Sequence, residues 1–241
     1  MDPRVKGIEL KLKDVRRIIS VVSGKGGVGK SLFSTALSLA LSREGHAAGL
    51  LDLDFYGASD HVILGFNPRD LKPEEDQGVI PPEVKGVKFM SIVYYTEEEP
   101  IPMRGKEVSD ALIELLAITR WDSLDFLVID MPPGLGEQFL DLMRFIPRGE
   151  YIVITTPSSL STNVATKVIS VLKENHQKIL GLVENMGNGE LEGYSKSMGL
   201  EYLGHIPKIT DLEKNIGRPE SLLGSEFGKF TEKIAKRIIS Q

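Results

Sequence analysis

Residues 24–31 constrain this chain more than any other part of its sequence. They read Gly-Lys-Gly-Gly-Val-Gly-Lys-Ser and match the pattern G-x-x-x-x-G-K-[ST]. An apolar run at residues 18–23 precedes them, and a helical pattern over residues 30–43 follows. Average residue usage would give the bare pattern by chance in about 1% of chains of this length. Because the strand–loop–helix context is the one that a phosphate-binding loop requires, we expect residues 24–31 to cradle nucleotide phosphates.

The residue types in this loop explain how it would bind. Glycines let successive backbone N–H groups approach phosphate oxygens, and the start of the following helix adds the positive end of its dipole. Lys30 is predicted to bridge the β- and γ-phosphates, and the Ser31 hydroxyl to ligate Mg²⁺. Lys25 is either a solvated lysine or a second cation that reaches the γ-phosphate of its own site or of a facing subunit. The predicted nucleotide-binding residues here are Gly24, Lys25, Gly26, Gly27, Val28, Gly29, Lys30, Ser31 and Leu32.

Two carboxylates at strand ends are predicted to complete the site. Asp130 ends the apolar run Phe-Leu-Val-Ile-Asp and is expected to hold magnesium through its water shell, and the N–H of Gly134 to sense the γ-phosphate. Asp54 follows another strand and is the candidate for orienting the attacking water, whereas Asp52 is interpreted as structural or outer-shell. The predicted metal residues are Ser31, Asp54 and Asp130, and the predicted catalytic residues are Lys25, Lys30 and Asp54. Each aspartate could instead be an ordinary turn residue.

Alternation of apolar runs with amphipathic stretches predicts an α/β fold, a single-domain doubly wound and mostly parallel sheet with helices on both faces. One domain is expected to span residues 1–241, with residues 1–14 as an N-terminal arm. The alternating Ile8, Leu10 and Leu12 suggest an edge strand or a partner-binding arm, and residues 66–86 suggest a mobile surface excursion. Predicted strands are residues 18–23, 47–53, 87–93, 126–130, 151–155 and 179–184, and predicted helices are residues 30–43, 110–118, 161–175 and 226–239.

Composition excludes several classes of function. The chain has no cysteine, which rules out disulfides, thiolate-bound zinc and an iron–sulfur cluster held by its own thiolates. Its net charge is −5, so nucleic acid is not expected as a partner, and the basic residues Lys11, Lys13, Arg16 and Arg17 are expected to decorate a solvated segment. Without an apolar run of membrane-spanning length or a signal region, a cytoplasmic location without membrane binding is expected. The four histidines lack paired ligand spacing.

The base is predicted to be adenine. The chain has no Asn-Lys-x-Asp turn of the kind that recognises guanine in many GTPases. Asn185 stands at the end of a late strand, and its amide is able to pair with the N6/N1 edge of adenine. The expected ligands are therefore ATP or ADP, with Mg²⁺.

Taken together, these motifs resemble the Mrp/MinD group of deviant Walker A P-loop ATPases. The resemblance rests on the double-lysine loop, Asp-Leu-Asp-Phe-Tyr-Gly-Ala-Ser59, Arg104-Gly-Lys106, Val-Ile-Asp-Met-Pro-Pro-Gly134 and Val-Glu-Asn-Met186. It implies a sheet of seven or eight strands, an ATP-dependent homodimer, Lys25 acting across it, Asp54 and Asp130 in two switch segments, and Asn185 on adenine. It also implies backbone contacts to the base from a segment that contains Ile206, Pro207 and Lys208.

One departure from the Mrp pattern narrows the resemblance. Many Mrp-type proteins carry Cys-x-x-Cys after the Asn-Met segment, where two subunits share an iron–sulfur cluster, and this chain has a short thiol-free segment there. It is similar in this respect to the cysteine-free archaeal Mrp/MinD-type HypB. That resemblance implies nickel insertion during [NiFe]-hydrogenase maturation, with the nickel chaperone HypA as partner. The alternatives are an iron–sulfur cluster carrier and a MinD/ParA-like positioning ATPase.

Overall fold

The computed structural model describes residues 3–96 and 105–241, so Arg104 and the first two residues lie outside it. An eight-stranded sheet runs through the centre, in the order β10-β9-β8-β1-β7-β2-β6-β5. Every pairing in it is parallel except that of β5 with β6. Its strands are β1 (Val15–Val22), β2 (Ala48–Asp52), β5 (Glu83–Val84), β6 (Val87–Ser91), β7 (Leu124–Asp130), β8 (Glu150–Thr155), β9 (Lys178–Asn185) and β10 (Tyr202–Ile206).

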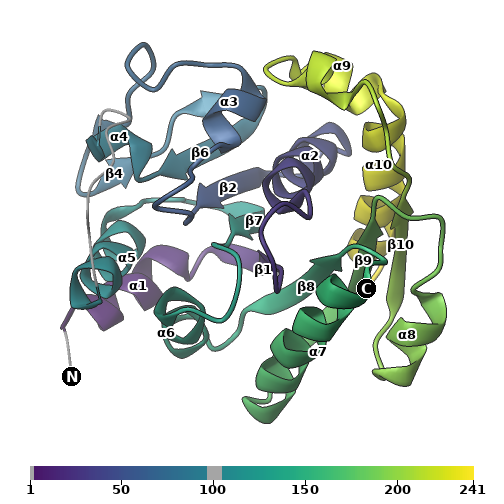
Figure 1. The fold of residues 1–241 in the computed structure, drawn as a ribbon. Coiled ribbons are helices and arrows are strands. Elements are labelled where there is room, and N and C mark those ends of the chain that lie inside the picture. The colour runs from purple at the N-terminus through teal and green to yellow at the C-terminus, as the bar shows by residue number, and fades with distance from the viewer. Residues whose placement is uncertain (1–2, 97–104) are drawn as a thin grey trace.

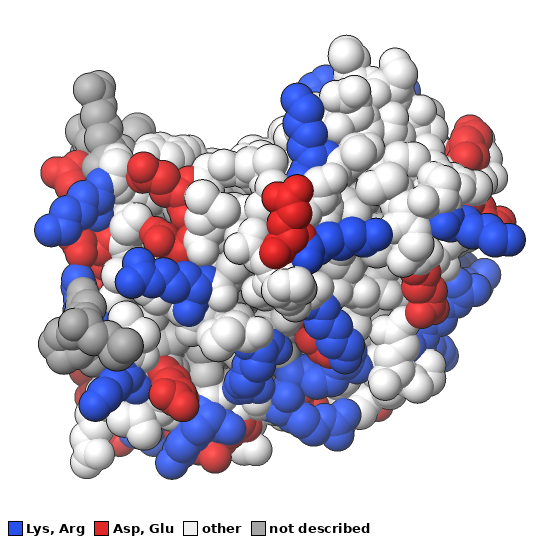
Figure 2. All heavy atoms as spheres, turned by 90° about the horizontal axis from the view of Figure 1, so that it is seen from below, with Lys and Arg blue, Asp and Glu red and all other residues white. Residues whose placement is uncertain are grey.

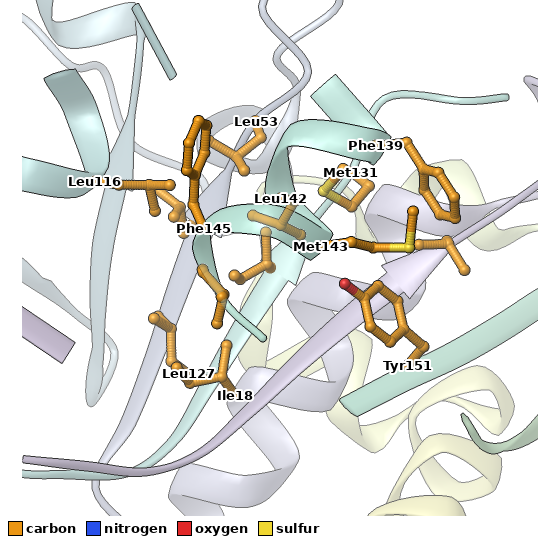
Figure 3. Close-up of a cluster of buried hydrophobic side chains, with 14 of the residues drawn as sticks. Ile18, Leu53, Leu116, Leu127, Met131, Phe139, Leu142, Met143, Phe145 and Tyr151 are labelled. Atoms are coloured by element: carbon orange, nitrogen blue, oxygen red, sulfur yellow. The ribbon is translucent and has the colours of Figure 1, made fainter. Parts of the chain in front are cut away.

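Helices cover both faces of this sheet (Figure 1). The core on one face includes α1, α5, α6 and α7, and Figure 3 shows part of it, where Met131, Phe139 and Tyr151 pack beside Leu142. The core on the other face includes α2, α3, α9 and α10. The helices are α1 (Pro3–Leu12), α2 (Lys30–Arg43), α3 (Asp60–Leu64), α4 (Val93–Thr96), α5 (Lys106–Ile118), α6 (Glu137–Phe145), α7 (Ser159–Glu174), α8 (Glu192–Ser197), α9 (Pro219–Gly224) and α10 (Glu226–Ile239), with the 3₁₀ turn η1 (Leu212–Asn215). The predicted fold class is confirmed.

The register of the central strands places the site. Asp130 of β7 pairs with Val21 of β1 on one side and with Asp52 of β2 on the other. The phosphate-binding loop leaves the same end of β1. Because parallel strands bring their carboxyl ends to one edge of a sheet, two aspartates and the loop meet there.

The N-terminal segment is a helix, so the predicted edge strand is wrong. Ile8 and Leu12 are buried and lie one helical turn apart on the face that packs against α5, while Leu10 between them is exposed. An alternation of apolar residues over so short a run fits the period of a strand as well as that of a helix. Packing against α5 and α6 selects the helix.

The structure adds detail to, or departs from, three other expectations. The strand predicted at residues 87–93 ends at Ser91, because Val93 begins the short α4. Residues 66–86 contain the hairpin of β3 (Glu74–Glu75) and β4 (Val79–Ile80) as well as β5, and Val79 bridges to Thr119. Arg17 is not a solvated decoration, because its guanidinium is largely buried against Glu150.

Surface charge is mixed on the face drawn in Figure 2. Basic side chains gather over the lower part of that view, with acidic side chains among them, so this face carries no uninterrupted basic stripe. Among the helices that the structure describes, none has the length and the apolar character needed to cross a bilayer.

Candidate functional site

The predicted phosphate loop lies between β1 and α2, where its backbone needs glycine. Gly27 and Gly29 have φ of 78° and 83°, in the left-handed region that a side chain disfavours. A Cβ on Gly24 would lie 2.7 Å from the backbone of Val164 in α7. The loop is therefore held close to α7 at one end, and Gly29 leads directly into α2 at the other.

A cavity of about 300 Å³ opens over this loop. It brings together six of the predicted loop residues and Leu32 with Asp54, which comes from the segment after β2. Both lysines of the loop and the Ser31 hydroxyl line this cavity. Its lining residues are Ser23, Lys25, Gly26, Gly27, Gly29, Lys30, Ser31, Leu32, Asp54, Ser59, Ile63 and Pro133.

Asp130 organises the floor of the site. Its Oδ2 accepts hydrogen bonds from Lys30 Nζ and from Ser31 Oγ, each at 2.7 Å, and its Oδ1 accepts one from Ser34 Oγ at 2.6 Å. Lys30 and Asp130 are both buried. A carboxylate that gathers the predicted phosphate lysine and the predicted magnesium hydroxyl suits a site where metal and phosphate meet.

Asp52 and Asp54 take different positions after β2. Asp52 is fully buried, and its Oδ1 accepts the N–H of Asp54 at 3.0 Å. Asp54 is partly exposed in the cavity, and its Oδ1 accepts the N–H of Gly57 at 3.0 Å. The structural or outer-shell role of Asp52 and the roles of Asp54 in water orientation and metal binding stay predictions.

Asp60, at the start of α3, was not predicted as part of the site. Carboxylate oxygens of Asp52, Asp60 and Asp130 lie within 4.8 Å of one another, and all three residues are buried. Burial and the neighbouring Asp130 carboxylate raise the pKa of Asp52 from 3.8 to about 7. Burial, together with Asp130 and Asp52, also raises the pKa of Asp60 well above its usual value. Within the described ranges this is the one potential metal-binding group found, and it contains no histidine.

The residues expected around the base lie beside the loop but outside the 300 Å³ cavity. Asn185 is buried at the end of β9, and its Nδ2 donates to the carbonyl of Val28 at 2.8 Å. Ile206 of β10 is the register partner of Asn185 on the neighbouring strand β9, and Pro207 and Lys208 follow Ile206 in the chain. The side chain of Asn185 thus supports the phosphate loop from behind, and its contact with adenine stays a prediction.

Lys25 lines the cavity, and Gly134 follows the lining residue Pro133. Lys25 is exposed. The N–H of Gly134 donates to the carbonyl of Ser23 at 2.8 Å, which links the Pro-Pro-Gly turn to the end of β1. Sensing of a γ-phosphate by Gly134 would require that link to open.

The segment that replaces the Cys-x-x-Cys region is anchored by one buried carboxylate. Oε1 of Glu184 accepts the N–H groups of Gly189 and Glu190, and Oε2 accepts the N–H of Leu191 and the hydroxyl of Tyr202. These bonds are 2.8 to 3.2 Å long. The short segment is therefore a well-defined turn on the side of the sheet formed by β9 and β10.

Residues 14–241 match the sequence model of a protein family, ParA, which is described as NUBPL iron-transfer P-loop NTPase. An iron–sulfur cluster carrier protein of Saccharolobus solfataricus is 32% identical over an alignment of 260 positions, which covers 97% of this chain and 88% of that protein. The iron–sulfur cluster carrier protein of Escherichia coli is 36% identical over an alignment of 255 positions, which covers 95% of this chain and 68% of that protein.

Solved structures agree with these relatives. The nucleotide-binding protein of Archaeoglobus fulgidus in complex with ADP has a TM-score of 0.76 at 28% identity, covering 94% of this chain and 93% of its own. The cell division ATPase MinD of Pyrococcus furiosus has a TM-score of 0.70 at 25% identity, covering 93% and 98%. The resemblance to the Mrp/MinD group is thus confirmed, while the names of these relatives give no support to the narrower HypB resemblance. The chain belongs to the NUBPL-type family of MinD- and ParA-like P-loop ATPases.

Proposed function

We propose that this chain uses ATP hydrolysis to control iron–sulfur cluster assembly, with the cluster ligands supplied by a second protein. The observation behind this proposal is that the phosphate loop, Asp54 in its cavity and Asp130 hydrogen-bonded to Lys30 and Ser31 lie together in a chain without a single cysteine. Relatives named as iron–sulfur cluster carriers support the pathway. The absence of thiolates here separates the ATPase from the cluster ligands.

The residues of the site divide the work of hydrolysis. Lys30, now paired with Asp130, is placed to move onto the β- and γ-phosphates, and the loop N–H groups bind the remaining oxygens. Ser31 and Asp130 would hold magnesium, directly and through water, which supplies charge neutralisation on the phosphates. Asp54 lines the cavity and is partly exposed, and it would orient the attacking water.

A homodimer across the cavity mouth is part of this proposal. Large apolar side chains are exposed on segments that follow the carboxyl ends of β2, β7 and β8, which is unusual on a solvated rim. They are Tyr56 at 65%, Leu135 at 37%, Leu140 at 50% and Leu160 at 70% exposure. Lys25 is exposed on the same rim, so a second copy could receive it.

Light scattering at fixed protein concentration tests the dimer. The expected result is a doubling of mass with Mg²⁺ and a non-hydrolysable ATP analogue, and no doubling for Leu160→Glu. The matched control is Leu10→Glu on α1, which is 66% exposed on another element and should dimerise normally. A monomer in every condition would contradict the dimer.

Affinity capture tests the function itself. Tagged wild-type chain is incubated anaerobically with native extract in ATP or in ADP, and captured material is analysed for iron, acid-labile sulfide and nickel. We expect a partner that differs between the two nucleotides and that carries iron and sulfide. Lys30→Ala should lose the nucleotide dependence. Equal capture in ATP and ADP by the wild type would refute the proposal.

Nickel insertion with the chaperone HypA is the second candidate. The thiol-free segment after β9 favours it, because a nickel chaperone would bring its own ligands. The same capture experiment decides between the two, since this candidate requires nickel, and not iron with sulfide, in the nucleotide-dependent complex.

A further inference from the structure

Asp60 has a place in the site that the family motifs do not account for. It is fully buried at the first position of α3, six residues beyond Asp54 on the same segment. Its carboxylate meets those of Asp52 and Asp130 within 4.8 Å. The opening of a five-residue helix is normally solvated, so a buried carboxylate there calls for a partner.

The contacts of Asp60 leave one oxygen unused. Its Oδ1 accepts the hydroxyl of Thr35 in α2 at 3.0 Å, and its N–H approaches Oδ2 of Asp52 at 3.5 Å. Its Oδ2 is buried and has no hydrogen-bond partner among the described residues. Thr35 thus fixes the carboxyl group while leaving half of it available.

The hydrogen bonds of the neighbouring Asp130 indicate what could bind the free oxygen of Asp60. Oδ2 of Asp130 is 2.7 Å from the Ser31 hydroxyl, which is the predicted magnesium ligand. Mg²⁺ gives up its water reluctantly and usually keeps several waters, each of which needs acceptors. When all three buried carboxylates are ionised, the ammonium of Lys30 alone does not balance their charge, and a hydrated cation would supply the rest.

We propose that Asp60 is a positioning residue for magnesium, whose free Oδ2 accepts a hydrogen bond from a water of the metal shell while Thr35 holds its other oxygen. This links the segment that carries Asp54 to helix α2 through the metal shell. The inference rests on magnesium-dependent nucleotide binding at this site. Outer-shell partners of this kind typically change metal affinity by roughly 10- to 100-fold.

Calorimetric titration of ADP at increasing Mg²⁺ tests the role without relying on turnover. For Asp60→Asn we expect ADP affinity without metal to stay within about twofold, while the Mg²⁺ concentration for half-maximal enhancement rises at least about 10-fold. Thr35→Val should raise it less, because the carboxylate remains but is no longer oriented. The control is Asp70→Asn, an exposed aspartate beyond α3, which should behave as wild type.

A second readout uses Mn²⁺ in place of Mg²⁺. Paramagnetic resonance should show weaker Mn²⁺ binding to the ADP complex of Asp60→Asn than to that of the wild type. An unchanged metal requirement in a folded Asp60→Asn overturns the inference, and if that variant does not fold, an unchanged requirement in Thr35→Val does so. A wild type whose ADP affinity ignores Mg²⁺ would overturn the magnesium part of the proposed function as well.

Discussion

The two ends of the central sheet treat buried charge in opposite ways. At the amino ends of β1, β8 and β9, one carboxylate, Glu150, receives Arg17 at 2.6 Å and also pairs with Lys178. At the carboxyl ends of β2 and β7, Asp52 and Asp130 meet a third carboxylate, and Lys30 supplies the neighbouring positive charge. Pairing with its two cations lowers the pKa of Glu150, although burial alone would raise it.

This difference separates stability from function within one sheet. A carboxylate with two cations is satisfied by the fold itself and needs nothing further. Three carboxylates with one ammonium are satisfied only when protons or a cation join them. The amino ends are therefore built to hold strands together, and the carboxyl ends to receive a ligand.

Removing the ammonium at the carboxyl end should have the largest effect. Lys30→Ala is expected to reduce ATP turnover by roughly 10³-fold, because a fixed positive charge on the transferred phosphate is lost. Steady-state phosphate release measures it. The matched variant Lys178→Ala at the amino end should turn over ATP within about twofold of wild type, and a large loss there would break the comparison.

Breaking the network at the amino end should act on stability alone. Glu150→Gln leaves Arg17 buried without its counter-ion, so the free energy of unfolding should fall by roughly 3 kcal/mol. Urea unfolding followed by circular dichroism gives this value. Turnover per folded molecule should be unchanged, and a variant that kept full stability would contradict the assignment of this end to the fold.

The pH dependence of stability should reveal the excess of carboxylates at the carboxyl ends of β2 and β7. Because the pKa of Asp52 is raised in the fold, its carboxyl favours folding below about pH 4, and that contribution is lost as pH rises towards about 7. Without nucleotide or metal, the stability of the wild type relative to Asp52→Asn should fall by up to about 1.4 kcal/mol per pH unit in this window. A difference that stays constant from pH 5 to pH 8 would show that Asp52 is not protonated in the fold.

The smallest effect is expected behind the phosphate loop. Asn185→Ala removes the hydrogen bond to the Val28 carbonyl, so affinity for ADP should fall about fivefold, or about 1 kcal/mol. Competition with a fluorescent nucleotide measures it. The exposed Asn188 three residues later supplies the control, since Asn188→Ala should bind as wild type does.

Much of this arrangement was predictable from the sequence because its signals are local. The loop glycines, Lys30, Ser31 and the strand that ends at Asp130 each follow from a short motif or an apolar run. Hydrophobic runs long enough for buried strands predicted the sheet. Because parallel strands end at one edge of a sheet, their carboxyl ends were expected to lie together. The geometry around Asp130 agrees with those inferences.

The role of Asp60 in the site and the N-terminal helix were not predicted from the sequence, for a common reason. In Gly57-Ala-Ser-Asp60, the aspartate has the pattern of a turn, and its burial depends on Thr35, which lies 25 residues away in the chain. The residues of α1 alternate over too few positions to exclude a strand, and packing against α5 decides the outcome. Both depend on contacts that no local pattern contains.

The turn held by Glu184 also limits how thiols could be engineered into this protein. Gly187 leaves no room for a Cβ, because one would collide with the Glu184 carboxylate. Gly189 has a φ of 97°, which strains any other residue. Leu191 is buried in the core, so its replacement would open a void.

These obstacles restrict where a Cys-x-x-Cys pair can be grafted into this region. Substituting Glu190→Cys together with Gly193→Cys avoids all three positions, since Glu190 is exposed and a Cβ on Gly193 meets open space. The two introduced thiols could let two copies of the chain bind one metal between them. The residues of the phosphate loop would remain unchanged.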